Sequence, residues 1–110
     1  MQVKNIFANS QPPQVGELSS TILRHKNVHI ERIISSASFG PCDYRQEQNE
    51  WVILLKGQAV MNIAGERIEL YSGDHVFLPS GLSHSVLSTS EGAVWLAVHV
   101  YEPKEKNTYK

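Results

Sequence analysis

Residues 43–57 read DYRQEQNEWVILLKG, a segment that is polar at its start and apolar from Trp51 to Leu55. Successive side chains of a strand point to opposite faces, so a strand here would be apolar on both faces. A strand with one solvated face should instead alternate apolar and polar residues. The segment therefore predicts a strand that is buried on both faces and ends at the turn residue Gly57. A carboxylate, Glu50, stands at its polar end.

The segments on either side of this one are also strand-like. Short runs of β-branched and aromatic residues are separated by the turn-forming residues Gly, Pro, Asn and Ser. The strands predicted in this way cover residues 28–35, 51–56, 58–63, 67–71, 75–79, 83–89 and 93–101. Residues 17–25 are ambiguous, because Leu18 and Ile22 are spaced as in a helix, whereas the β-branched Thr21 and Ile22 favour a strand. Seven or more short strands predict an all-β sandwich or barrel.

The predicted strands divide the chain into three parts. Residues 1–14 contain Pro12 and Pro13, which disfavour helix, and we interpret this segment as an irregular N-terminal arm. Residues 15–102 hold one predicted barrel domain, and residues 103–110 form a polar tail. A length of 110 residues suits one domain.

Composition and charge exclude several classes of function. The net charge of −1 provides neither a basic surface for nucleic acid nor a polybasic patch for membrane lipid. The longest apolar runs, WVILL and AVWLAV, are far too short to cross a bilayer. The single cysteine, Cys42, cannot form an internal disulfide, and no apolar run near the N-terminus is long enough for a secretion signal. We therefore expect a soluble, cytoplasmic protein.

Two spaced motifs add a family resemblance. Residues 73–84, GDHVFLPSGLSH, consist of Gly, five residues, Pro-x-Gly, two residues and His. Upstream, Glu50 is followed by six residues and Gly57. In this order, the two motifs resemble the second conserved motif of the cupin superfamily and the closing half of the first. The resemblance covers residues 38–88 and implies an all-β, single-domain cupin, an RmlC-like jelly-roll β-barrel that is open at one end.

The sequence departs from the cupin pattern at the metal ligands. A cupin metal is typically held by an HxH pair, the motif Glu and the His of the second motif. Glu50 and His84 match the last two ligands, but Tyr44-Arg45-Gln46 stands where HxH is expected. In this the chain is similar to a little-characterised group of small bacterial cupins that lack the HxH pair. The resemblance leaves open both a metal-free pocket and a site for one divalent transition metal (Zn, Fe, Mn or Ni).

Strand parity suggests which residues share the pocket. If the strand is regular from residue 44 onward, Tyr44, Gln46 and Glu50 point to one side of the sheet. The resemblance places His84 opposite them, and His99 is a fifth candidate on the last predicted strand. Glu50, His84, Gln46 and an inward-pointing His99 are the candidate metal ligands. Without a metal, Glu50 and His84 would pair directly, with Tyr44 and Gln46 satisfying the remaining hydrogen bonds.

These residues fit two functions of different class. The first is a small-molecule-binding cupin domain with a polar pocket in the barrel, with or without a divalent metal. The second is an enzyme of isomerase, lyase or oxygenase type that acts on a small polar metabolite. In that enzyme His84 would be the general base or a metal ligand, and Tyr44 would donate a proton.

Two further expectations concern the surface. The doubly apolar strand over residues 51–56 predicts a homodimer packed through sheet faces, because its second face needs a cover in so small a domain. The remaining histidines, including His25 and His29, are interpreted as surface residues. No partner other than a small molecule and a second copy of the chain is expected.

Overall fold

The computed structural model describes residues 1–38 and 42–103. All seven predicted strands are present within two residues of their expected bounds, and residues 17–25 also form a strand. The nine strands of the described part are β1 (Glu17–His25), β2 (Val28–Ser35), β3 (Cys42–Tyr44), β4 (Asn49–Lys56), β5 (Gln58–Ile63), β6 (Glu66–Tyr71), β7 (His75–Leu78), β8 (His84–Thr89) and β9 (Ala93–Val100). Within this part, no helix is long and apolar enough to span a membrane.

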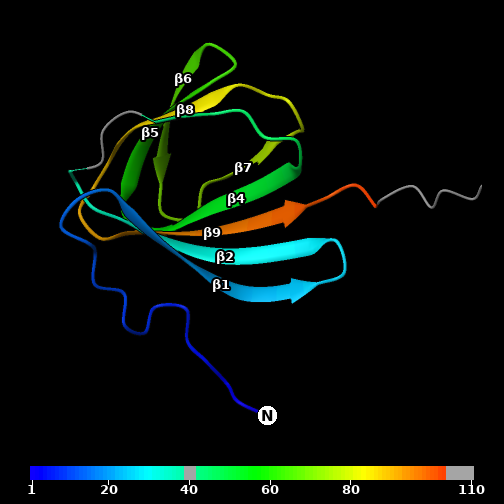
Figure 1. Cartoon of the computed structure of the whole chain (residues 1–110). Coiled ribbons are helices and arrows are strands. Elements are labelled where there is room, and N and C mark those ends of the chain that lie inside the picture. The colour runs from blue at the N-terminus through cyan, green and yellow to red at the C-terminus, as the bar shows by residue number, and fades with distance from the viewer. Residues whose placement is uncertain (39–41, 104–110) are drawn as a thin grey trace, which may run out of the picture.

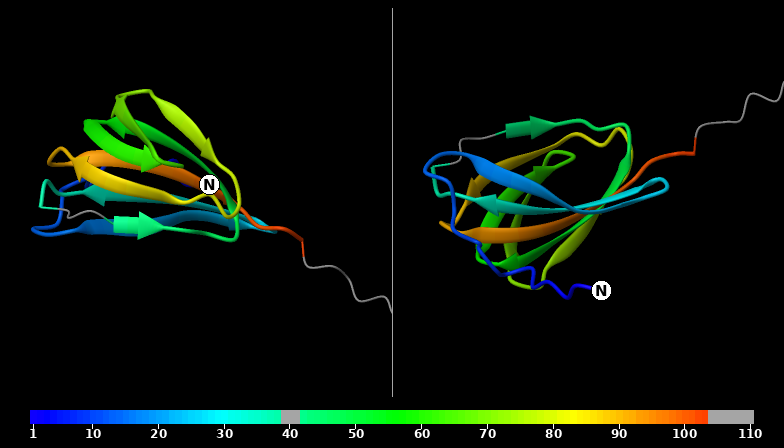
Figure 2. Two further views of the ribbon diagram at one scale, coloured as in Figure 1. Left: turned by 90° about the horizontal axis from the view of Figure 1, so that it is seen from above. Right: turned by 60° about the horizontal axis from the view of Figure 1, so that its bottom comes forward.

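The strands form two antiparallel sheets that face each other (Figure 1). The larger sheet has the order β1-β2-β9-β4-β7, and the smaller has the order β3-β8-β5-β6. Strands that are distant in sequence lie side by side, so that β9 is inserted between β2 and β4. Figure 2 shows the two sheets curving toward each other around a common interior. The prediction of an all-β, single-domain jelly roll is confirmed.

The hydrophobic core lies between the two sheets. Burial alternates along β4, so that Glu50, Val52 and Leu54 face the interior. The intervening residues Trp51 and Ile53 are half-buried on the outer face of the larger sheet. The buried core cluster consists of Val52, Leu54, Ala59, Met61, Leu70, Leu78, Ala93, Trp95 and Ala97. The outer face of β4 is therefore apolar, as the sequence indicates, but it is only partly covered within one chain.

The predicted regular strand from Tyr44 to Glu50 is wrong. β3 ends at Tyr44 in the smaller sheet, whereas β4 begins at Asn49 in the larger sheet. Residues 45–48 form the crossing between the sheets, and the side-chain oxygen of Asn49 accepts a hydrogen bond from the backbone N–H of Ser80 at 2.9 Å. This bond ties the crossing to the turn before β8, so the polar segment follows the rim of the barrel and not a strand.

The N-terminal segment is held against the outer side of β2. The guanidinium of Arg32 donates hydrogen bonds to the carbonyl oxygens of Ile6 at 3.0 Å and Ala8 at 2.6 Å. Two backbone carbonyls on one guanidinium fix this turn of the arm although it has no strand of its own. Of the predicted polar tail, residues 104–110 lie outside the described residues.

Candidate functional site

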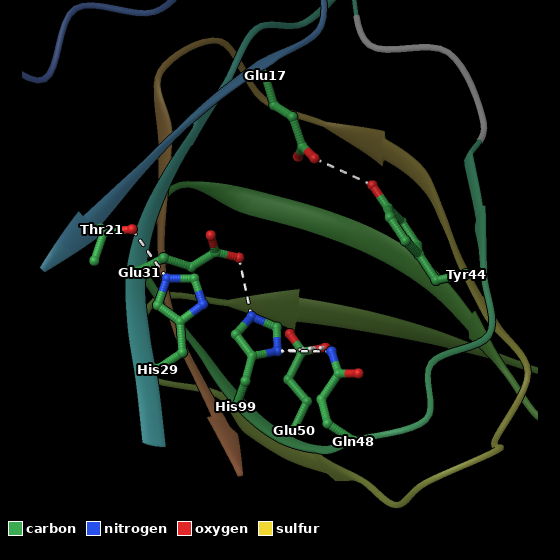
Figure 3. Close-up of polar contacts among 8 residues, drawn as sticks. All are labelled: Glu17, Thr21, His29, Glu31, Tyr44, Gln48, Glu50 and His99. Atoms are coloured by element: carbon green, nitrogen blue, oxygen red, sulfur yellow. Dashed lines mark hydrogen bonds and ion pairs between the residues drawn. The ribbon is translucent and has the colours of Figure 1, made fainter. Parts of the chain in front are cut away.

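A cavity of about 240 Å³ opens between the two sheets. All five pocket residues predicted from the sequence line it, and they come from both sheets and from the crossing between them: Tyr44, Gln46, Glu50, His84 and His99. Polar residues of β1 and β2, which the sequence did not reveal, complete the wall: Glu17, Ser19 and Glu31. Figure 3 shows how the carboxylates and imidazoles approach one another.

Strand register places His99 inside the barrel. Glu50 lies directly opposite His99 in the pairing of β4 with β9. Trp95 and Ala97 share the face of His99, and both are buried in the core between the sheets. Because alternate residues of a strand share one face, the imidazole of His99 points inward beside Glu50.

Two hydrogen bonds fix the ring of His99. Its Nε2 lies 2.9 Å from Oε1 of Glu31, and its Nδ1 lies 3.1 Å from Nε2 of Gln48 (Figure 3). An ionised carboxylate only accepts hydrogen bonds, so Nε2 of His99 donates to Glu31. Both ring nitrogens of His99 are therefore already engaged, Nε2 by Glu31 and Nδ1 by the amide of Gln48.

Glu50 is a buried carboxylate with an unsatisfied oxygen. Its residue surface is 7% exposed, and its Oε1 is buried with no hydrogen-bond donor among the described residues. Nδ1 of His99 is 4.0 Å away, too far for a hydrogen bond. An acceptor left without a donor in a buried site is costly, so this oxygen needs a donor from a bound water, ion or ligand, or a proton of its own.

The surroundings of Glu50 favour its protonated form. Burial is the largest effect and raises the pKa of Glu50. Positive charge on His99 or His84 lowers that pKa, the nearby Glu31 raises it, and the amide of Gln46 lowers it. Burial prevails, so the pKa of Glu50 lies above its ordinary value of 4.5.

His84 and Tyr44 form a second polar group on the smaller sheet. They are direct partners across β3 and β8, and their rings are stacked with centroids 5.4 Å apart. Nδ1 of His84 lies 3.1 Å from the carbonyl oxygen of Leu82. Since a carbonyl only accepts, Nδ1 carries the proton, and a neutral His84 has its lone pair on Nε2. The predicted direct pair of Glu50 with His84 is therefore not formed. His84 is hydrogen-bonded to the backbone carbonyl of Leu82, and the imidazole nearest to Glu50 is that of His99.

Tyr44 is hydrogen-bonded to a carboxylate from the edge strand. Its hydroxyl donates to Oε1 of Glu17 at 3.1 Å (Figure 3). Burial raises the pKa of Tyr44, and the neighbouring Cys42 and Glu17 raise it further. Burial also raises the pKa of Glu17 above its ordinary value of 4.5. The phenol therefore stays protonated across the physiological range.

His29 lies closer to this group than the sequence suggested. It is half-buried, its Nε2 lies 3.0 Å from the hydroxyl of Thr21, and its ring centroid lies 5.6 Å from that of His99. The reason is again register, because His29 is directly opposite His99 in the pairing of β2 with β9. His25, by contrast, is exposed as expected.

A comparison with protein families now identifies the fold. The family model described as "Cupin domain" matches residues 29–99, which is more than half of the chain. The chain belongs to the cupin family. The match includes all five predicted pocket residues and ends at the last of them, His99. The resemblance noted from the two motifs is confirmed.

Two solved structures and one curated protein are similar to this cupin over half of its length or more. A solved structure from Ralstonia eutropha JMP134, named a "putative mannose-6-phosphate isomerase", has a TM-score of 0.80 and 29% identity over 93% of this chain and 100% of its own. A conserved Streptococcus pyogenes protein of unknown function has a TM-score of 0.77 and 19% identity, over 92% of this chain and 88% of its own. An uncharacterised Aquifex aeolicus (strain VF5) protein is 36% identical over 55 residues, which are 50% of this chain and 46% of that protein. That match spans less than half of the relative's length.

The side chains of the described residues are not arranged as the metal-binding set of a cupin. In residues 1–38 and 42–103, no three His, Cys, Asp or Glu side chains are grouped as metal ligands. Both ring nitrogens of His99 are engaged, by Glu31 and Gln48, so ligation through His99 would require Gln48 to move. The carboxylate oxygen of Glu50 is the one predicted ligand atom that is buried and unsatisfied.

The carboxylates of β1 and β2 could not be found from sequence alone. Glu31 shares a face with the apolar Ile33, in a strand whose inner face cannot be distinguished from its outer face by its sequence pattern. It becomes a pocket residue because β2 pairs with β9 and places Glu31 opposite Ala97, beside His99. The one available signal was parity with His29, which had itself been interpreted as a surface residue.

Proposed function

We propose that this cupin binds a small molecule in the cavity between its two sheets. The observation that supports this best is the carboxylate of Glu50, which lines the cavity and whose buried Oε1 has no donor among the described residues. Small-molecule sites are concave, largely apolar and carry a few convergent polar groups. Glu50, His84 and His99 are those polar groups here.

The rest of the wall supports a small ligand. Its floor is apolar and is formed by residues of both sheets: Ile33, Val52, Met61, Leu78, Val86 and Trp95. The volume of about 240 Å³ is below the roughly 300–1,000 Å³ typical of drug-sized ligands. We infer a ligand of metabolite size whose carbon frame packs on this floor.

An enzyme acting on a small polar metabolite is the second candidate. It is favoured by His84, whose Nδ1 is held by the Leu82 carbonyl so that Nε2 can act as a general base. Tyr44, stacked on that ring and kept protonated, is the matching proton donor. The similar structure from Ralstonia eutropha is named an isomerase, which belongs to the same class of enzyme.

A thermal-shift panel of small amines, sugars, sugar phosphates and carboxylic acids tests the proposal. The variant Val86→Trp fills the cavity, and Val15→Trp makes the same kind of change at an exposed position just before β1. We expect at least one compound to raise the melting temperature of the wild type and of Val15→Trp but not of a folded Val86→Trp. Absence of any shift, or an equal shift in Val86→Trp, would contradict a cavity site.

The same compounds separate binding from catalysis. If the chain is an enzyme, a compound that binds is converted, and His84→Asn stops conversion while binding persists. If binding occurs with no product detectable by NMR after prolonged incubation, the enzymatic candidate is rejected.

A further inference from the structure

The charges of the cavity wall are strongly one-sided. Three carboxylates reach it from three strands of the larger sheet, namely Glu17 from β1, Glu31 from β2 and Glu50 from β4. Among the described residues that line the cavity, none is Lys or Arg. The basic groups of the wall are the imidazoles of His84 and His99, and both ring nitrogens of His99 are already engaged by Glu31 and Gln48.

The wall is also short of hydrogen-bond donors where the charge is buried. The carboxylate of Glu31 receives the Nε2 proton of His99, and that of Glu17 receives the hydroxyl proton of Tyr44. Oε1 of Glu50 receives none from the described residues, and the nearest imidazole nitrogen, Nδ1 of His99, lies 4.0 Å away and is engaged by Gln48. A ligand that fits this wall must therefore bring the donor itself.

Such a wall is poorly suited to an anion. Sites for phosphate or carboxylate groups are usually built from Arg, Lys or converging backbone N–H groups. A sugar phosphate would instead bring negative charge against three carboxylates with no lysine or arginine in the described wall. A sugar phosphate, the substrate class in the name of the Ralstonia eutropha structure, is therefore not the ligand that this cavity favours.

We propose that the ligand is a small organic cation, a primary amine or an amidine, whose N–H groups donate to the carboxylate of Glu50. This rests on the proposed function, since it assigns the ligand of the same cavity. The cation supplies the missing donor and neutralises the buried carboxylate in one contact. Its carbon frame lies on the apolar floor, beside the stacked rings of Tyr44 and His84. A metal ion is less suited, because the described side chains offer no group of three ligands.

Matched probe pairs test this assignment. Binding is measured at pH 8 by calorimetry and ligand-observed NMR for benzamidine against benzamide, butane-1,4-diamine against butane-1,4-diol, and glucosamine against glucose. Mannose 6-phosphate is the anionic probe, and Zn²⁺ is the metal probe. The variant Glu50→Gln keeps the shape of the side chain without its charge, and Glu66→Gln makes the same change at an exposed position.

We expect at least one cationic probe to bind the wild type at least tenfold more tightly than its neutral partner. The preference should persist in Glu66→Gln and disappear in Glu50→Gln. If neutral or phosphorylated probes bind in a manner blocked by Val86→Trp while the cations do not, the cavity is a ligand site but the cation assignment is wrong. A preference that survives in Glu50→Gln, or stoichiometric Zn²⁺ binding that depends on Glu50, also overturns it. If no probe binds, the assignment falls, and the broader thermal-shift panel decides separately whether the cavity binds anything.

Discussion

At the residue scale, the carboxylate of Glu50 is the group whose surroundings are least compatible with its charge. It is buried between the sheets, and its Oε1 has no donor among the described side chains. Removal of a carboxylate from water penalises the ionised form, which is why burial raises the pKa of Glu50. The folded protein should therefore bind a proton at Glu50 more readily than the unfolded chain does.

This difference predicts how stability depends on pH. Between the ordinary value of 4.5 and the raised pKa of Glu50, the folded state holds more protons than the unfolded state, so stability falls as pH rises through that window. At pH values above both the unfolded and the folded pKa of Glu50, each unit by which folding raises that pKa lowers the free energy of unfolding by about 1.4 kcal/mol. Glu17, whose pKa burial also raises, acts in the same direction.

The variant Glu50→Gln should lose its share of this dependence. We expect a smaller decrease in melting temperature between pH 4.5 and pH 8 than in the wild type, and a higher melting temperature at pH 8 in the absence of ligand. The groups that tune the effect are those around Glu50, namely His99, His84, Glu31 and Gln46. Glu66→Gln is the control. Parallel pH profiles for wild type and Glu50→Gln would show that Glu50 is solvated.

The candidate site was only partly predictable at this scale. The spacing to Gly57 marked Glu50, and the second motif marked His84, because motifs fix positions along one chain. The partners of His99 were not predictable. Glu31 and Gln48 meet that ring through strand pairing and through the crossing between sheets, and neither leaves a local pattern in the sequence.

At the element scale, the tight turn between β4 and β5 depends on Gly57. Its backbone has φ of +99°, a left-handed conformation that side chains rarely adopt. A Cβ at this position would lie 2.6 Å from Oγ of Ser90 and 3.1 Å from Cα of Ala93. The turn is therefore constrained by both conformation and space.

The pair Gly57→Ala and Gly65→Ala separates these two constraints. Gly65 has φ of +85°, but a Cβ there meets nothing within 4 Å. We expect Gly65→Ala to lower the free energy of unfolding by about 1 kcal/mol and Gly57→Ala to lower it by about 2–3 kcal/mol. The loss is larger at Gly57 because the new Cβ also displaces the hydroxyl of Ser90, which accepts a hydrogen bond from the backbone N–H of Gln58. Urea denaturation measures both. Equal losses would mean that the contact with Ser90 relaxes without cost.

Strand positions were largely predictable because alternation and turn residues are local signals. Residues 28–35 and 58–63 form β2 and β5 as predicted, and the ambiguous residues 17–25 form β1. The run from Tyr44 to Glu50 was not predictable in the same way. Its residues carry no pattern that distinguishes a continuing strand from a crossing, and hydrogen bonds to the distant turn before β8 decide the matter.

At the scale of the whole molecule, the outer face of the larger sheet carries a row of apolar side chains. Register aligns one residue from each strand: Leu23, Ile30, Val98, Trp51 and Phe77. Phe77 is 59% exposed and Leu23 is 47% exposed, although both belong to this row. Contiguous exposed apolar surface on a small domain is typical of an interface.

We expect this row to be the centre of a homodimer interface in which the larger sheets of two copies pack face to face. Light scattering at micromolar concentration should give twice the chain mass of 12.3 kDa. Phe77→Glu should shift the protein to the monomer, because it places a charge in the apolar row. Tyr71→Glu, which alters an exposed aromatic residue of the other sheet, should leave the dimer intact. A wild type that is monomeric at this concentration would contradict the interface.

The central claim is that the cavity is a ligand site anchored by the carboxylate of Glu50. A crystal structure of the wild type grown with a saturating cationic probe, such as benzamidine, tests it most directly. The account predicts density for the probe between the sheets, with a nitrogen within hydrogen-bond distance of Oε1 of Glu50 and the Glu31–His99 hydrogen bond retained. An empty cavity in which Oε1 of Glu50 accepts a hydrogen bond from another side chain of the protein would contradict it.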